Sequence, residues 1–369
     1  MMIMRVCVVV PYLLPDRSGF EYSMTREFCR SGIDATIITS NTHPFRKNFR
    51  YPDGWQNYRG LKVFRINTNL KFHQAPFISF DEKLLEKISP DLVFAGEYFQ
   101  PLSIFASKFC RQFKIPFFFN QHMYKYPEGM FGFNFKIYDN LIRKFVWDNT
   151  KRAIAISQVA KSFLKSLRFK KRIDVITGGV DTRVFKRGKG NLRKLLSIDK
   201  TTFLILCVSR FSPEKGIMKI PLIADATRNL NVHYVVIGNG PLKDEFSTSL
   251  KGLRNVDVIS FIPHSQMSKI YSDADLYIAP SNVEVLNYSA LEAMSCGVPV
   301  LASNVGGMRD IINGSAGFLL PSNDIGAWAE KIRDFFEKKI EFKRDKIRKH
   351  AESFDWKLVA KKTIEVMSS

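Results

Sequence analysis

The chain has 369 residues, of which 45% are hydrophobic and 25% are charged, as in globular proteins of about two domains. This composition excludes disordered and fibrous proteins. The formal net charge is +21, from 56 Lys and Arg residues against 35 Asp and Glu residues, and such an excess attracts phosphates, nucleic acid or an anionic membrane surface.

The first predicted element lies at the N-terminus. The string "MMIMRVCVVVPYLLP" has a short apolar run interrupted by Pro11, and no A-x-A-like cleavage site follows it. We interpret it as a buried strand and not as a signal peptide. Five dispersed cysteines without a C-x-x-C pair indicate a reducing compartment, so we expect a cytoplasmic protein. No stretch approaches the ~20 apolar residues of a membrane span.

Short aliphatic runs alternate with helical patterns along the chain. Strands rich in Val and Ile at helix-sized intervals predict parallel sheets covered on both faces. The fold class is therefore α/β, with two Rossmann-like domains facing a cleft, which is the default ligand site. The predicted strands are 6–10, 35–39, 62–66, 91–96, 116–120, 153–157 and 173–177 in the first half, and 203–208, 233–238, 256–260, 275–280, 298–303 and 317–320 in the second.

The domain boundaries follow from this series. We expect an N-terminal domain over residues 1–183 and a C-terminal domain over 184–353, joined near the string "GGVDTRVFKRGKGN". Residues 354–369 form a last helix, with Asp355 as its N-cap. Because this helix follows a completed domain, we expect it to pack back on the N-terminal domain.

Two carboxylates mark the string "SNVEVLNYSALEAMSCGVPVLASNVGG" at 281–307. Ser289 and Glu292 fit an S-x-x-E capping box, which would explain Glu292 and leave Glu284 without a role. A helix that begins between Asn287 and Ser289 instead leaves Glu284 in the preceding loop. The helix N-terminus between the two acids then suits a ligand that carries phosphate and several hydroxyls.

Several further strings complete a recognisable pattern. They are "VITGGVDTRVF", "VSRFSPEKG", "VVIGNGPLKDEF" and "DADLYIAPS", which precede the E-x7-E pair and the string "AMSCGVPVLASNVGG". In this order they resemble the retaining glycosyltransferases of the GT-B fold, in the large group called family 4. The resemblance covers most of the chain and is strongest from about Ile173 to Pro321. It implies an acceptor-binding N-terminal domain and a C-terminal domain that binds a nucleotide-sugar donor.

The resemblance also implies roles for residues of the C-terminal half. Arg210 and Lys215 would hold the donor diphosphate, so that cations replace the metal ion of other transferases and no cofactor is expected. Gly238 and Gly240 would let the backbone approach the nucleotide. Glu292 would bind the ribose hydroxyls, a role that competes with the capping box.

Glu284 would contact the donor sugar near the reacting centre, as a nucleophile or as a stabilising charge. The loop Leu286, Asn287 and Tyr288 would meet the sugar hydroxyls through its backbone. Asn287 stands where the family has a small residue, which leaves the donor sugar open. Gly178 replaces the usual residue before "GVD" and would loosen the interdomain link.

Two residues of the N-terminal half match the family. Gly19 stands where the family has a glycine pair near the donor phosphate and the acceptor, so one glycine of the pair is missing. His122 follows a strand and matches a histidine that reaches the donor sugar; a structural role for a lone histidine is the alternative. The resemblance thus predicts transfer of a sugar to an acceptor such as a glycolipid, a lipid carrier or a growing polysaccharide.

Other functions compete with transfer. A nucleotide-sugar epimerase of the same fold would need no acceptor, and a non-catalytic protein would only bind the nucleotide sugar. Asp273 and Asp275 spell the D-x-D of metal-dependent transferases, but they precede a strand at the end of a helix, which argues against a metal site. No nucleic-acid reading motif is present, so we expect no nucleic-acid partner.

Residues 131–152 combine basic and aromatic residues with helical spacing. The surrounding region, 101–185, holds 16 Lys and Arg against 5 Asp and Glu. The helix either faces the core of the N-terminal domain or lies on a membrane surface. The second alternative predicts peripheral attachment to the anionic cytoplasmic face of a membrane.

Overall fold

The protein is described here from a computed structural model, which places residues 3–14, 19–44, 46, 49–68, 70–72, 75–78 and 82–369. The chain divides into two units. The first comprises Met1–Thr177 and Trp356–Ser369, and the second comprises Gly178–Asp355. Each unit is built on its own largely parallel sheet, as the spacing of the aliphatic runs predicts.

The sheet of the first unit has the strand order β10-β9-β8-β7-β1-β2-β4-β3 within the described residues, and β3 alone among these pairs antiparallel to its neighbour. The chain moves outward from β1 through β2 to β4, then returns to the other side of β1 with β7. The strands are β1 (Arg5–Val9), β2 (Asp34–Ser40), β3 (Gly54–Tyr58), β4 (Leu61–Ile66), β7 (Leu92–Gly96), β8 (Phe117–Gln121), β9 (Thr150–Ala155) and β10 (Ile173–Val175), with a separate hairpin of β5 (Leu70–Phe72) and β6 (Ala75–Phe77).

Helices cover both faces of this sheet. The helices are α1 (Phe20–Arg30), α2 (Glu82–Ile88), α3 (Pro101–Gln112), α4 (Gly129–Asn149), α5 (Gln158–Ser166) and α14 (Trp356–Ser368). Alternate strand residues point to opposite faces, so Val93 and Phe117 join the cluster under α3 and α5. Phe94, one residue after Val93, instead meets Phe28 of α1, with ring centroids 6.4 Å apart.

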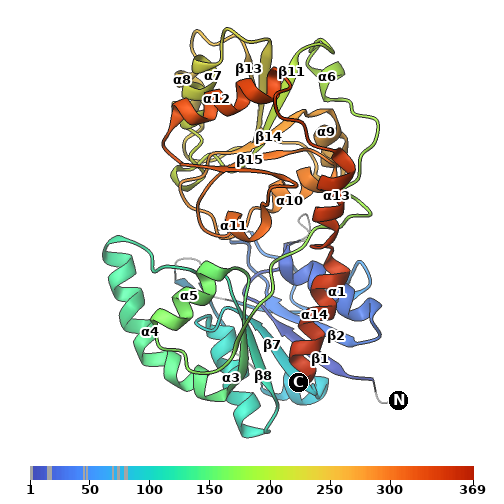
Figure 1. Cartoon of the computed structure of the whole chain (residues 1–369). Coiled ribbons are helices and arrows are strands. Elements are labelled where there is room, and N and C mark those ends of the chain that lie inside the picture. Colours follow the sequence, from blue (N-terminus) through green and yellow to red (C-terminus); the bar gives the residue numbers. More distant parts are fainter. Residues whose placement is uncertain are drawn as a thin grey trace. The chain divides into compact units, whose positions relative to one another are not determined.

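The last helix, α14, belongs to the first unit and lies beside α1 (Figure 1). Trp356 is 3% exposed, and its ring meets Phe20 edge-on at 5.5 Å. Val359, Ala360 and Met367 are buried on the same helix. The apolar spacing of this segment therefore explains why it packs on α1.

The sheet of the second unit has the order β13-β12-β11-β14-β15-β16 and is parallel throughout. Its strands are β11 (Phe203–Val208), β12 (Val232–Ile237), β13 (Val256–Ile259), β14 (Leu276–Ala279), β15 (Val300–Ser303) and β16 (Gly317–Leu320). Its helices are α6 (Leu192–Leu195), η1 (Pro213–Lys215), α7 (Lys219–Ala226), α8 (Lys243–Ser249), η2 (His264–Gln266), α9 (Met267–Asp273), α10 (Tyr288–Ser295), α11 (Met308–Ile311), α12 (Ile325–Phe336) and α13 (Arg344–Glu352). Helix α12 packs on α7, whereas α10 packs on α13 and α9.

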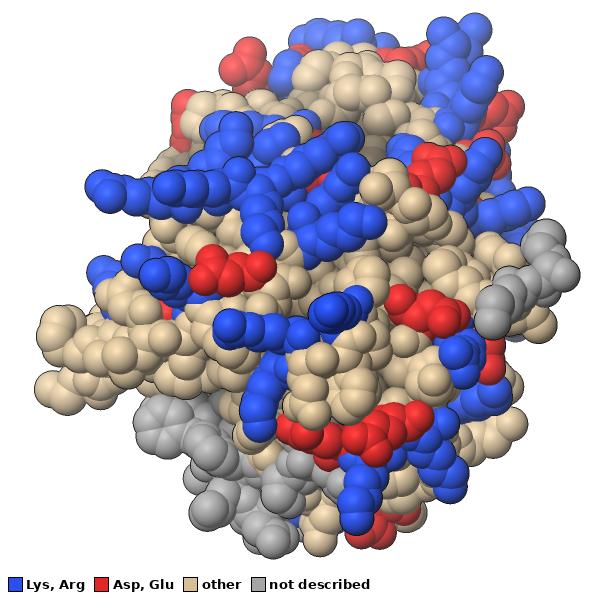
Figure 2. Space-filling model, turned by 90° about the horizontal axis from the view of Figure 1, so that it is seen from below, with Lys and Arg blue, Asp and Glu red and all other residues tan. Residues whose placement is uncertain are grey.

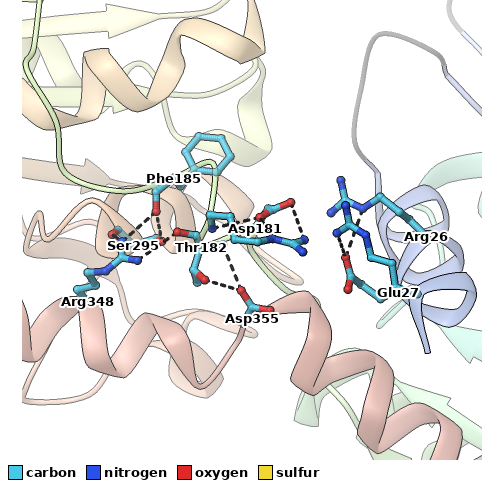
Figure 3. A network of polar contacts seen from close by, with 10 residues as sticks. Arg26, Glu27, Asp181, Thr182, Phe185, Ser295, Arg348 and Asp355 are labelled. Atoms are coloured by element: carbon cyan, nitrogen blue, oxygen red, sulfur yellow. Dashed lines mark hydrogen bonds and ion pairs between the residues drawn. The ribbon is translucent and has the colours of Figure 1, made fainter. Parts of the chain in front are cut away.

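The segment after Thr177 is bound to the second unit, which explains why the units divide there and not after residue 183. Arg348 of α13 donates to the carbonyl oxygens of Thr182, Phe185 and Ser295 at 3.1, 3.2 and 2.7 Å (Figure 3). Asp355 accepts from both the backbone N–H and the hydroxyl of Thr182, at 3.2 and 2.5 Å. Asp355 thus ties residues 178–185, the linker segment, to the end of α13.

Among the described residues, no helix is both long and apolar enough to cross a bilayer.

Candidate active site

The strand order of the second unit brings two loops together. The chain leaves β11 in one direction toward β12 and β13, and it returns to the other side of β11 with β14. Ligands of open parallel sheets bind where the strand order reverses, beyond the carboxyl ends of the strands. The loops at this point carry Arg210 and Lys215 after β11 and Glu284 after β14.

Glu284 lies at the centre of this site and is 5% exposed. The Lys215 Nζ lies 2.8 Å from each of its carboxylate oxygens. Ser281 Oγ and Asn287 Nδ2 donate to Oε2 at 3.2 Å each. The structure thus brings together two residues that the resemblance placed on the donor sugar and the donor diphosphate, and adds Ser281, which the sequence analysis missed.

The turn that carries Lys215 is bonded to the Glu284 loop. The backbone N–H groups of Asn282 and Val283 both donate to the Glu214 carbonyl, at 2.9 and 3.0 Å. Gly216 ends the turn with φ +60°, and a Cβ there would lie 2.1 Å from the Pro280 carbonyl oxygen. This close approach requires glycine and fixes Lys215 against the loop.

The glycine pair at 306–307 holds the backbone of Glu284. Gly306 has φ +51°, and a Cβ on it would lie 1.7 Å from the Glu284 carbonyl oxygen. The N–H of Gly307 donates to the same oxygen at 3.1 Å. These two glycines therefore position the Glu284 loop, in addition to any contact with a ligand.

Asn287, and not Ser289, caps helix α10. Its side chain accepts from the N–H of Ala290 at 2.9 Å. Glu292 lies beyond this cap and accepts from His264 Nε2 and the Tyr271 hydroxyl, each at 2.8 Å. The capping-box interpretation of Glu292 was therefore wrong, because the N-cap is Asn287, two residues before Ser289, and the helix already has its cap. The hydrogen bond to Glu292 raises the pKa of His264.

Two glycines after β12 are required by close backbone contacts within the protein. A Cβ on Gly238, which has φ +152°, would lie 1.8 Å from the Ser209 carbonyl oxygen. A Cβ on Gly240 would lie 2.3 Å from the Phe211 carbonyl oxygen. Both glycines thus hold the loop around Arg210, whose side chain is 55% exposed and pairs with Glu214.

The loop Leu286–Tyr288 packs against Gly178. A Cβ on Gly178 would lie 2.6 Å from Leu286 Cδ2 and 2.5 Å from the Tyr288 hydroxyl. Leu286 and Asn287 are each 7% exposed. Gly178 was expected to loosen the link between domains, but its lack of a side chain instead leaves room for this loop.

The two acids of the D-x-D string take part in contacts within the second unit. Asp275 Oδ2 accepts from the Arg193 guanidinium at 2.6 Å and from the N–H of Leu204 at 2.8 Å. Asp273 Oδ2 accepts from the backbone N–H of Arg193 at 3.1 Å. The described residues form no cluster of three or more His, Cys, Asp and Glu side chains that could hold a metal ion.

The first unit places the remaining predicted residues beside two further acids. Gly19 is the N-cap of α1. The His122 Nε2 lies 2.7 Å from Asn120 Nδ2, and its ring meets Phe20 edge-on at 5.3 Å. Burial lowers the pKa of His122 to about 4, so the imidazole is neutral at neutral pH.

Glu97, which the sequence analysis missed, follows β7 directly. Its Oε1 accepts from the N–H groups of His122 and Met123 at 2.9 Å each. Burial raises the pKa of Glu97 to about 8; those two hydrogen bonds oppose the increase, and the charge of Glu21 adds to it. An acid directly after a buried strand was the signal that could have revealed it.

This raised pKa predicts a pH dependence of stability. The native protein keeps the Glu97 proton up to about pH 8, whereas the unfolded chain releases it near 4.5. Unfolding between these values releases a proton, so stability falls as pH rises, by at most about 1.4 kcal/mol per pH unit. We expect Glu97→Gln to lose this slope in urea unfolding at pH 5 to 8. The exposed Glu86→Gln should keep it, and parallel curves for all three proteins would contradict the prediction.

Two family sequence models match adjacent parts of the chain. The model of Glycosyltransferase Family 4 matches residues 22–184, and that of Glycosyl transferases group 1 matches residues 189–354. The chain belongs to glycosyltransferase family 4. The first model ends and the second begins close to the linker segment, so each domain of the family corresponds to one sheet.

Curated relatives in the family match part of the chain. A D-inositol 3-phosphate glycosyltransferase of Mycolicibacterium smegmatis is 30% identical over 232 residues, which are 57% of this chain and 51% of the relative. A sulfoquinovosyl transferase of Arabidopsis thaliana is 28% identical over 165 residues, 43% of this chain and 32% of the relative. The chain thus spans about half the length, or less, of these relatives.

Solved structures match the whole chain. Sucrose-phosphate synthase of Thermosynechococcus elongatus has a TM-score of 0.77 at 18% identity, over 99% of this chain and 98% of that one. HepE of Anabaena, solved with UDP and glucose, has a TM-score of 0.74 at 19% identity, over 99% of each chain. At such identities the likeness concerns the fold, and it confirms the predicted GT-B class.

Proposed function

We propose that this chain is a retaining, metal-independent glycosyltransferase that moves a sugar from a nucleotide diphosphate to an acceptor bound by the N-terminal unit. The observation that carries the proposal is the Glu284 carboxylate, held by Lys215, Ser281 and Asn287 where the strand order reverses. Neighbouring Arg210 supplies an exposed cation. The fold likeness to HepE, which was solved with UDP and glucose, supports a nucleotide-sugar donor.

The reaction breaks the bond between the anomeric carbon and the diphosphate oxygen, which leaves with the electron pair, and forms a bond from that carbon to the oxygen of an acceptor hydroxyl. The proton of that hydroxyl is released together with the nucleoside diphosphate. Arg210 would stabilise the negative charge that develops on the departing diphosphate. Glu284 would face the positive charge that develops at the anomeric carbon, as nucleophile or stabilising anion. Lys215, which already contacts both Glu284 oxygens, would hold that carboxylate in place and add a second cation near the leaving group.

Nucleotide binding offers the direct test. We expect one of UDP, GDP and ADP to raise the thermal unfolding temperature in the presence of EDTA, since ligand at a hundred times its Kd stabilises by about 2.7 kcal/mol. Arg210→Ala and Glu292→Ala should each lose the shift. A matched control is Arg228→Ala, because Arg228 is also exposed and paired, with Asp225, but precedes β12 at the opposite edge of the sheet.

Each alternative outcome has a meaning. A shift that appears only with added Mg²⁺ would contradict metal independence. No shift with any nucleotide, or equal shifts in Arg210→Ala and wild type, would contradict the donor site.

We further propose that the acceptor is presented at an anionic membrane surface, on which α4 lies. Helix α4 buries Gly132, Asp139 and Val146 on one side. On another side it exposes four large apolar residues at helical spacing: Met130 (81%), Phe133 (64%), Ile137 (48%) and Leu141 (76%). Lys136 and Lys144 are also exposed on this helix. One side of α4 therefore packs on its own domain, as the first alternative expects. The exposed apolar side supports the second alternative, contact with a membrane surface.

The sequence region that contains α4 favours an anionic partner, because residues 101–185 hold 16 Lys and Arg against 5 Asp and Glu. Figure 2 shows one face of the molecule on which Lys and Arg side chains cover more area than Asp and Glu do. Apolar side chains flanked by lysines suit the interface of a bilayer with anionic head groups.

Vesicle binding checks this proposal. We expect the protein to sediment with vesicles of phosphatidylcholine and phosphatidylglycerol but not with phosphatidylcholine alone, and to dissociate at high salt. Phe133→Ser with Leu141→Ser should weaken binding at least tenfold, whereas Leu222→Ser, an exposed leucine of α7, should not. Equal binding to both vesicles, or to neither, would contradict it.

A further inference from the structure

A second group of polar residues lies where the strand order of the first unit reverses, between β1 and β7. Glu97 follows β7, and Glu21 lies in the first turn of α1. A Cβ built on Gly96 would lie 3.6 Å from Glu21 Oε1, so the Glu21 carboxyl rests against the backbone next to Glu97. Asn120 and His122 border the group from the end of β8.

The hydrogen bonding of three oxygen atoms indicates what this group can bind. Glu97 Oε1 is occupied by two backbone N–H groups, while Oε2 is buried without a hydrogen-bond partner among the described residues. Asn120 is 1% exposed, and its Oδ1 is likewise buried and has no partner in that set. Buried polar groups are rarely left unpaired unless a ligand or water completes them.

The charges of the group limit what can complete it. A phosphate dianion would bring its negative charge next to the Glu21 carboxyl and offers no donor for Asn120 Oδ1. A sugar hydroxyl both donates and accepts, so it suits Glu97 in either protonation state and Asn120 as well.

We propose that Glu97, Glu21 and Asn120 form a subsite for a neutral hydroxylated ring of the acceptor, and that Glu97 is a positioning residue for the hydroxyl that attacks the donor. The proposal rests on the transferase function proposed above. It separates this chain from those curated relatives that are named for a phosphorylated inositol. The neighbouring His122, predicted to reach the donor sugar, would border the same hydroxyl.

Binding of small probes tests the subsite without any turnover. Saturation-transfer difference NMR would compare methyl α-glucoside and myo-inositol with glucose 6-phosphate and myo-inositol 3-phosphate, with and without the nucleotide chosen in the thermal assay. We expect signals from at least one neutral probe and none above background from the phosphorylated probes. Preferential binding of the phosphorylated probes, or no neutral probe binding, would overturn the proposal.

Variants separate positioning from folding. Glu97→Gln retains an Oε1 acceptor for the two backbone N–H groups and changes only the free oxygen. We expect it to raise the KM of the best neutral probe at least tenfold and to leave the thermal shift by nucleotide unchanged; Glu86→Gln should change neither. Glu21→Gln should raise the same KM if Glu97→Gln fails to fold. An unchanged KM in both Glu variants would overturn the proposal, whereas absence of any nucleotide shift in wild type would instead reject the donor site.

Discussion

Replacing Lys215 with methionine is expected to lower the rate of sugar transfer by about 10²- to 10³-fold, the usual loss when a charge that stabilises a transition state is removed. The same change leaves Glu284 buried without its cation, which costs about 3–5 kcal/mol when one partner of a buried ion pair is lost. Turnover and urea unfolding would be measured on the same preparation.

The double variant distinguishes the two effects. Glu284→Gln with Lys215→Met removes both charges, so we expect it to recover stability relative to Lys215→Met alone while remaining inactive. A matched control is Lys331→Met, since Lys331 is 26% exposed, against 25% for Lys215, and pairs with Asp334 at 3.0 Å on α12. Wild-type activity in Lys215→Met would reject the assignment of the Glu284 site.

A single methyl group at Gly306 is expected to displace the Glu284 loop. The added Cβ would meet the Glu284 carbonyl oxygen at 1.7 Å, and φ +51° is unfavourable for alanine by about 1–2 kcal/mol. Because a shift of about 1 Å at a reacting group can cost about 10²-fold, we expect transfer to fall at least that much.

Gly314→Ala is the matched control, as a Cβ there meets no atom within 4 Å. Circular dichroism would establish that both variants fold, and turnover would then be compared at saturating donor. Equal activities in the two variants would show that the approach of Gly306 to Glu284 has no catalytic importance.

Much of the fold could be predicted because the strands are buried on both faces. Runs such as residues 203–208 coincide with β11, and all six predicted strands of the second half are present. Strand β3 was missed, since Gly54–Tyr58 alternates between half-buried and exposed residues at a sheet edge and lacks a continuous aliphatic run.

The candidate site was predictable only in part. The E-x7-E spacing located Glu284 and Glu292, but not that Lys215, 69 residues away in the chain, contacts Glu284. Such a contact depends on which strands are neighbours, and the strand order is decided by packing over the whole sheet. The capping-box alternative for Glu292 failed for a local reason, because Asn287 and Ser289 are both good caps and sequence alone does not choose between them.

Helix α14 has a consequence for biosynthesis. The ribosome completes the strands of the first unit early, but Trp356, which contacts Phe20, emerges only after the whole second unit. During translation the apolar side of α1 therefore stays uncovered while the whole second unit is made and can fold. In a nascent chain of this topology, chaperones would need to cover that apolar surface. Residues 1–177 expressed alone would expose the same side of α1 and tend to aggregate.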